Sequence, residues 1–129
     1  MSLCRDNGGR VYEPMSNDFT NDQFYMAVID LWVKRRGTQA ECWLGIVDNS
    51  PNDDLANDWI YSSSENNVTS FNWKVSNNQP RDGDGNCAYF KGSNGQWFNG
   101  DCGQIRNFIC EFGTLFCILK SKWINITLS

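Results

Sequence analysis

Apolar and polar positions follow a helical period over residues 20–37. The apolar positions recur every three or four residues and form one stripe: Phe24, Ala27, Val28, Leu31 and Trp32. Thr20 is a good N-cap, and Gln23 stands three residues later, as a capping box requires. Basic residues fill positions 34–36, and Gly37 follows as a C-terminal cap. The pattern predicts one amphipathic helix whose stripe packs into a core.

After this helix the pattern changes to short apolar runs. Residues 43–47 form a run that suits a buried strand. Residues 87–90 and 96–98 flank a Gly-Ser-Asn-Gly turn at 92–95, which predicts a β-hairpin. Residues 107–112 form the last strand. The pattern therefore predicts an α+β domain with one clear helix, small antiparallel sheets and long loops.

The segment between residues 48 and 86 is polar and turn-rich. Four aromatic residues stand in it among Ser, Asn and Gly: Trp59, Tyr61, Phe71 and Trp73. This is too irregular for a helix and too aromatic for a disordered linker. We expect Trp43, Trp59, Trp73 and Trp97 to pack in the core or at the base of loops, and we expect these loops to carry the function.

Composition narrows the function classes. A length of 129 residues suits one domain. The chain has no histidine, which removes imidazole as a general base or metal ligand. A net charge of −4 disfavours nucleic acid, and no run of 18 apolar residues predicts a membrane span. None of the 15 acidic residues has the apolar setting of a general acid, so we expect no enzyme.

Six cysteines without any C-x2-C pair favour disulfides over a zinc site. Disulfides imply an oxidising compartment, and N-x-T sequons beginning at Asn67 and Asn125 agree with it. We therefore expect an extracellular or secreted protein. Residues 1–3 lead directly into Cys4 without a signal peptide, which predicts a mature fragment or a truncated product.

A series of motifs points to a known family. They are Cys4-x4-Gly9, Trp43-Leu44-Gly45-Ile46, Gln79-Pro80, Cys87, Trp97-x4-Cys102 and Phe108-Ile109-Cys110-Glu111-Phe112. In this order and spacing, residues 3–112 resemble a C-type lectin-like domain. The resemblance implies a double-loop fold whose end strands pair and whose long loop leaves and re-enters the core. It also implies two disulfides, Cys4–Cys110 and Cys87–Cys102, which would restrain a loop-rich chain.

The chain departs from the family pattern at both ends. Only three residues precede Cys4, so the first strand and most of the first helix are missing, and the edge of the last strand is expected to be exposed. Residues 113–129 extend beyond the family's usual end. Cys42 and Cys117 have no place in the family's disulfide scheme. They pair with each other, pair with another chain, or stay free.

The loop NNQPRDGDGNC, residues 77–87, is the candidate site. In calcium-dependent members of the family, a Glu-Pro-Asn or Gln-Pro-Asp triplet with a cis proline and a later Asn-Asp pair bind the ion and the sugar together. Here the triplet is Gln79-Pro80-Arg81 and the pair is Phe98-Asn99. Arg81 and Phe98 thus replace oxygen ligands, and the neutral oxygens that remain bind Ca²⁺ weakly.

Three interpretations of this loop stay open. A shift of one residue would bring in Asp82 and give a metal site of Gln79, Asp82 and Asn99. Alternatively, the loop is a solvated Asp/Gly turn, or Arg81 forms a surface ion pair with a neighbouring aspartate. The candidate ligand-binding residues are Gln79, Arg81, Asp82, Asp84, Asn86, Phe98 and Asn99. A second acidic loop, residues 48–58, is a further candidate for structural calcium or a polar surface loop.

The leading hypothesis is an extracellular recognition module that binds a glycan, with Phe98 or Tyr61 as a ring on which a sugar could stack. The alternative is a calcium-independent domain that binds protein or assembles with a partner chain. A disulfide through a surplus cysteine, or pairing along the strand edge, would link such a partner.

Overall fold

The computed structural model describes residues 2–50, 58–113, 115–118 and 123–125. Two α-helices and two 3-10 turns are present in these ranges: α1 (Ser2–Asp6), η1 (Phe19–Asn21), α2 (Gln23–Arg36) and η2 (Val75–Asn77). The strands are β1 (Arg10–Val11), β2 (Cys42–Asp48), β3 (Trp59–Tyr61), β4 (Cys87–Lys91), β5 (Gln96–Gly100), β6 (Asn107–Phe112), β7 (Leu115–Ile118) and β8 (Trp123–Asn125). The predicted strands and hairpin are confirmed.

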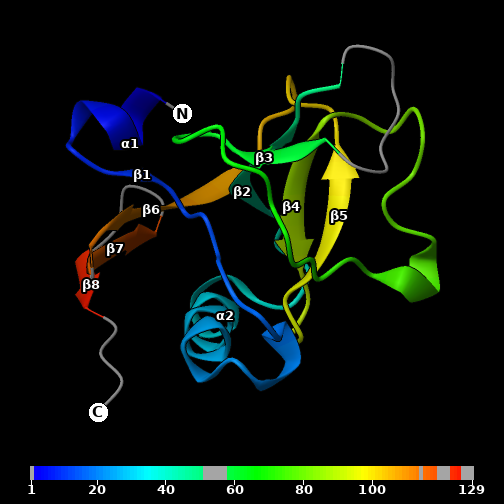
Figure 1. Ribbon diagram of the computed structural model, residues 1–129. Coiled ribbons are helices and arrows are strands. Elements are labelled where there is room, and N and C mark those ends of the chain that lie inside the picture. The colour runs from blue at the N-terminus through cyan, green and yellow to red at the C-terminus, as the bar shows by residue number, and fades with distance from the viewer. Residues whose placement is uncertain (1, 51–57, 114, 119–122, 126–129) are drawn as a thin grey trace.

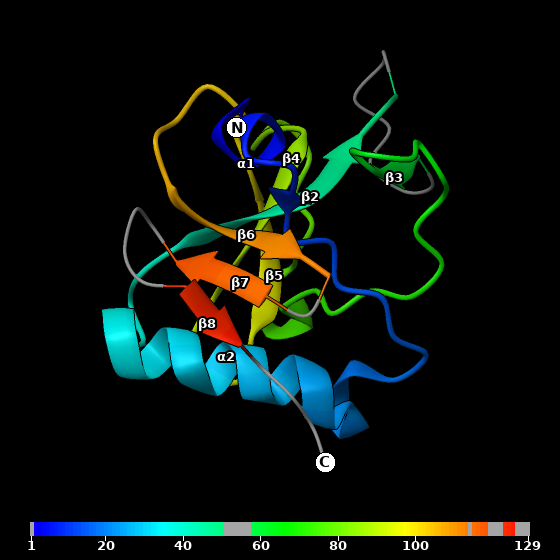
Figure 2. The ribbon, with the colours of Figure 1, turned by 90° about the vertical axis from the view of Figure 1, so that its left-hand side faces the viewer.

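The strands form one sheet in the order β5-β4-β2-β6-β7-β8, with β1 paired to β6 and β3 paired to β2 (Figure 1). All pairs are antiparallel except β2 and β6, which run parallel over two residues. Figure 2 shows α2 lying along one side of the molecule, and its buried residues pack in one core cluster with residues of β2, β4, β5 and β6. The α+β class predicted from the sequence is confirmed.

Helix α2 begins later than predicted. Asp22, and not Thr20, is its N-cap, because the Asp22 carboxylate accepts a hydrogen bond from the Tyr25 backbone N–H at 2.9 Å. Thr20 belongs to η1 instead, where its hydroxyl donates to Asp18 Oδ1 at 2.6 Å. Burial also shifts by one position along the predicted stripe. The fully buried residues of α2 are Tyr25, Val28, Ile29 and Trp32, whereas Phe24, Ala27 and Leu31 are partly buried.

Aromatic rings fill the main core between α2 and the sheet. Trp32, Trp59 and Trp97 are fully buried, and Trp73 packs against them from a loop. Trp97 contacts Trp73 edge-on, with 5.7 Å between ring centroids. Each buried indole removes a large apolar area from water. The packing of these rings therefore stabilises long loops that form few hydrogen bonds to neighbouring strands. The predicted core role of the tryptophans is confirmed.

Strand β6 is the last strand that the sequence predicted, and its edge was expected to be exposed. In the structure both edges of β6 are paired. β7 pairs antiparallel with β6 over Ile109–Phe112, and β1 pairs with β6 on its other side. The prediction of an exposed edge was wrong, because the chain beyond Gly113 turns back and supplies a strand of its own. This pairing could not be foreseen from a family pattern that ends near residue 112.

Both expected disulfides are present. Cys4 and Cys110 join α1 to β6, with 5.3 Å between Cα atoms, and Cys87 and Cys102 join β4 to the loop after β5, at 5.2 Å. Cys42 is a free thiol that is completely buried at the start of β2, and burial raises its pKa. Of the three alternatives left open for Cys42, the free cysteine is the one that the structure shows. The Cys117 side chain lies outside the described part.

Candidate functional site

The candidate loop spans residues 77–86 and leans on strand β5. It begins at the C-terminal end of η2, passes through a cis Gln79–Pro80 bond, and enters β4 at Cys87. The Cys87–Cys102 disulfide closes the base. The cis proline that the resemblance implied is confirmed.

Asn99 on β5 is the centre of the site and is only 3% exposed. Its Oδ1 accepts from the Arg81 backbone N–H at 2.7 Å. Its Nδ2 donates to the Arg81 carbonyl at 2.7 Å and to the Gly85 carbonyl at 2.9 Å. Gln79 completes the network from the other side, because its Oε1 accepts from the Asn99 backbone N–H at 3.0 Å. The loop and the strand are thus joined by four hydrogen bonds.

The charged residues of the loop lie outside this network. Arg81 is exposed, and its Nε donates to the Asn77 carbonyl at 3.1 Å. Asp82 and Asp84 are also exposed. In the described ranges, Arg81 forms no ion pair with either aspartate, so the ion-pair interpretation is not the arrangement seen. Asn86 is half-buried, and its carbonyl accepts from the Asp48 N–H at 2.8 Å.

These residues do not fit a calcium ion. Calcium requires six to eight oxygen ligands, several of them carboxylates. The two side-chain oxygens that remain, Gln79 Oε1 and Asn99 Oδ1, each already accept a backbone N–H. Asp82 makes no hydrogen bond to either of these residues in the described part of the chain, and the Arg81 guanidinium adds positive charge nearby. Across the described ranges, no three His, Cys, Asp or Glu residues are grouped as a metal site.

The second acidic loop is only partly described. Asp48 is buried, and its Oδ1 accepts from the Ser50 backbone N–H at 2.9 Å. Asp58 is exposed. Asp53 and Asp54 lie outside the described residues, so the structural-calcium expectation for this loop stays untested.

The two aromatic residues expected to stack on a sugar are buried. Phe98 is 6% exposed and stacks on Tyr89 with 5.3 Å between centroids, and Lys91 Nζ lies 5.1 Å from its ring centroid. Tyr61 is 7% exposed, and its hydroxyl donates to the Pro14 carbonyl at 3.3 Å. Neither ring offers an open face of the kind that sugar stacking needs.

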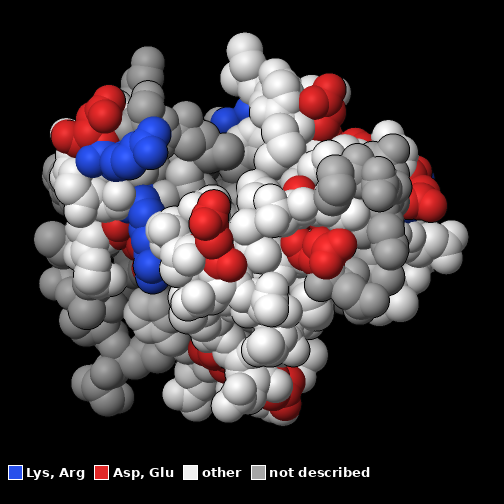
Figure 3. All heavy atoms as spheres, turned by 45° about the horizontal axis from the view of Figure 1, so that its top comes forward, with Lys and Arg blue, Asp and Glu red and all other residues white. Residues whose placement is uncertain are grey.

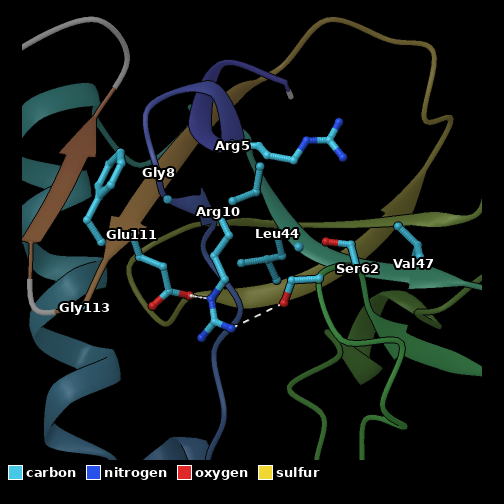
Figure 4. A pocket seen from close by; sticks show the side chains of 13 residues that line it. Arg5, Gly8, Arg10, Leu44, Val47, Ser62, Glu111 and Gly113 are labelled. Atoms are coloured by element: carbon cyan, nitrogen blue, oxygen red, sulfur yellow. Dashed lines mark hydrogen bonds and ion pairs between the residues drawn. The ribbon is translucent and has the colours of Figure 1, made fainter.

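A second polar cluster was not predicted, and it lies beside a cavity of about 1100 Å³ between α1, β1, β2 and β6 (Figure 4). Glu13 is buried and accepts from Ser63 N–H and Ser63 Oγ at 2.8 Å each and from Ser62 Oγ at 3.3 Å. Arg10 lies 3.2 Å from Glu13 Oε1 and 3.1 Å from Glu111 Oε1. Burial raises the pKa of Glu111, although its hydrogen bond from the Glu13 N–H and the Arg10 charge act against this.

The sequence held one signal for this cluster. Arg10 and Glu13 stand three residues apart in a segment that resembles the family's link between its two helices. Nothing local to Glu111 or Ser63 predicts that they meet it, since they are about 100 and 50 residues away.

Charged side chains of both signs lie on the face of the molecule that Figure 3 shows. Figure 3 shows acidic side chains spread over one face of the molecule, with basic side chains gathered mainly on one side of it. This fits the small net charge of −4. No helix in the described ranges is both long and apolar enough to cross a membrane.

Comparison with known proteins identifies the family. The family model "Lectin C-type domain" matches residues 1–112, so the chain belongs to the C-type lectin domain family. Two similar solved structures are the carbohydrate-recognition domains of the mouse and human scavenger receptor C-type lectins. The chain is 22% identical to each and covers 84% of its own length in both matches, with TM-scores of 0.59 and 0.57 over 75% and 76% of those chains. No curated protein matches significantly.

This membership has a general consequence. Domains of this family are generally recognition modules without enzymatic activity. The identity to the two solved structures is low enough that their likeness shows the fold alone.

Proposed function

We propose that this domain is an extracellular recognition module that binds a protein ligand through residues 77–102 without calcium. The observation that carries the proposal is the hydrogen bonding of Gln79 and Asn99. Both oxygens that could reach an ion are already bonded to backbone N–H groups. In this proposal a ligand is bound by direct contacts and not through a shared cation.

The exposed tip of the loop favours a protein over a glycan. Arg81, Asp82 and Asp84 place one positive and two negative charges within four residues, all exposed. Charges of both signs at a rim are suited to a complementary charged surface, where they set specificity and association rate. The ring of Phe98, by contrast, is covered by Tyr89 and Lys91 and does not support a stacked sugar.

Glycan binding is the second candidate, because one observation favours it. Asn77 and Asn78 are exposed amides at the start of the loop. Amide groups can donate to and accept from sugar hydroxyls without a metal. The same calcium-free surface would then bind a glycan more weakly than a chelating site does.

Two further features support an extracellular location. Two disulfides persist in oxidising compartments. Asn67 and Thr69 of the first sequon are exposed, so this sequon is accessible to a glycosyltransferase. Asn125 lies in β8, and the rest of its sequon is outside the described residues.

The test compares two probes with and without chelator. We expect the domain to bind at least one member of a panel of purified extracellular protein ectodomains, equally well in excess calcium and in EDTA. Arg81→Glu should abolish this binding, whereas Lys34→Glu on α2 should preserve it. EDTA-sensitive binding on a glycan array, or a calcium-dependent change in tryptophan fluorescence, would overturn the proposal.

A further inference from the structure

We propose that Asn99 is a positioning residue whose amide fastens the loop from Gln79 to Gly85 onto β5, so that the loop holds its ligand-binding shape with no cation. The inference rests on the proposed function, because it explains how a loop of this family can stay ordered when its ion ligands are replaced. It concerns the fold of the loop before any ligand arrives.

The first step is the geometry of the Asn99 amide. Its oxygen and nitrogen contact the N–H and the C=O of the same residue, Arg81, at 2.7 Å each. This closes a ring of two hydrogen bonds, like those between paired strands. The Asn99 side chain thus gives the Arg81 backbone the two hydrogen bonds that a neighbouring strand would otherwise provide.

The second step is that Asn99 uses both polar atoms of its side chain and its backbone N–H in this network. The second Asn99 N–H donates to the Gly85 carbonyl, and the Asn99 backbone N–H donates to Gln79. Asn99 is nearly fully buried, so each of these bonds, once broken, leaves a polar atom without water to replace its partner. The loop therefore opens only at a cost comparable to several hydrogen bonds.

The third step is close contact at the far end of the fastened segment. A Cβ placed on Gly85 would lie 2.1 Å from the Gly100 carbonyl carbon and 2.3 Å from the Asp101 nitrogen. Backbone therefore lies directly against backbone where Asn99 reaches Gly85. The Arg81 side chain adds a fifth hydrogen bond, within the loop, to the Asn77 carbonyl.

The experiment measures hydrogen exchange at the backbone amides of residues 79–86, without ligand. Wild-type protection and melting temperature should be the same in calcium and in EDTA. Asn99→Ala should accelerate exchange in this loop by about tenfold or more while amides of α2 and β2 change little. Asn94→Ala, an exposed turn asparagine on the same hairpin, is the matched control and should leave loop exchange unchanged.

A second variant tests the amide itself. Asn99→Asp keeps the oxygen that accepts from Arg81 but replaces the donor with a carboxylate that faces two carbonyls. Loop protection should fall at neutral pH and partly recover at a pH below about 4, where a carboxyl regains a proton to donate. Asn99→Ala should show no such recovery.

Two results would overturn the inference. One is a wild-type loop whose protection rises on adding calcium. The other is an Asn99→Ala loop that exchanges as slowly as wild type. These readouts need no ligand, so a protein panel that yields no binder would count against the proposed function and leave the role of Asn99 to be judged separately.

Discussion

Two buried polar side chains hold irregular backbone in this domain, and they do so by different chemistry. Glu13 and Asn99 are both 3% exposed, and each joins segments that are far apart in the sequence. Glu13 is a carboxylate that has a cationic neighbour, Arg10, and accepts three hydrogen bonds from Ser62 and Ser63. Asn99 is a neutral amide whose contacts are all to backbone or to Gln79.

Because of this difference, we expect pH and salt to affect the contacts of Glu13 but not those of Asn99. A buried carboxylate depends on its partner, since the charge is costly to keep once the partner is removed. A neutral amide has no charge to screen or titrate, so its bonds persist across pH and salt. The stability of the Glu13 junction beside the cavity should therefore depend on pH and salt, whereas that of the loop of residues 77–86 should not.

The largest effect is expected at the charged junction. Glu13→Ala leaves the Ser63 N–H and the hydroxyls of Ser62 and Ser63 without their acceptor, so the unfolding free energy should fall by about 3–5 kcal/mol. Asn99→Ala should cost less, about 1–3 kcal/mol, because the hydrogen bonds it removes are all between neutral groups. Urea denaturation of both variants measures the two losses. Asp30→Ala, an exposed position on α2, is the control; equal losses for Glu13 and Asn99 would contradict the comparison.

Two glycines, Gly85 near Asn99 and Gly45 near Glu13, test the same comparison through the backbone. Gly85 has φ +135° and its added Cβ would meet backbone atoms, so Gly85→Ala should cost about 3 kcal/mol or more. Gly45 is crowded by the Glu13 side chain and the Val11 carbonyl at 2.7 Å, without positive φ, so Gly45→Ala should cost about 1–3 kcal/mol. Thermal melts rank the two. The reverse order would show that the loop near Gly85 yields more easily than its contacts indicate.

The smallest expected effect is a pH dependence confined to the charged junction. Burial raises the folded-state pKa of Glu111, so the folded protein holds this proton more tightly than the unfolded chain. Stability of wild type relative to Glu111→Gln should therefore fall as pH rises above about 4.5, until the folded-state pKa is passed. Denaturation midpoints across this range measure it. The exposed Glu65→Gln should show no such trend, and a parallel trend there would remove the assignment to Glu111.

The sequence predicted the main helix, the hairpin and the strands well, because these elements depend on local patterns. It predicted the disulfides through the spacing of the cysteines. The helical stripe, the Gly-Ser-Asn-Gly turn at 92–95 and the strand at 107–112 each carry their own periodicity or turn chemistry. The helix N-cap was misplaced by two residues, because Thr20 and Asp22 are both good caps and only tertiary contacts select between them.

The sequence predicted which residues make up the candidate site, but not which of them contact one another. The sequence identified Gln79, Arg81, Asp82 and Asn99 among the candidate ligand-binding residues, with Gln79, Asp82 and Asn99 as a metal site in one of three interpretations. It could not show that Asn99 bonds to the backbone of Arg81, because that depends on how β5 meets a loop 18 residues earlier. The Glu13 junction was missed for the same reason, since its donors come from a segment about 50 residues away.

The pairing of β7 with β6 changes which strand forms this edge of the sheet, and therefore how many unpaired backbone groups another molecule can reach. The strand order now ends at β8, which is three residues long, in place of the six-residue β6. Within the described ranges, a strand of this length offers fewer backbone donors and acceptors than β6, so this edge is a poorer template for stacking copies into fibrils. A protein lacking residues 114–129 would uncover β6 and should precipitate at lower concentration than the full chain.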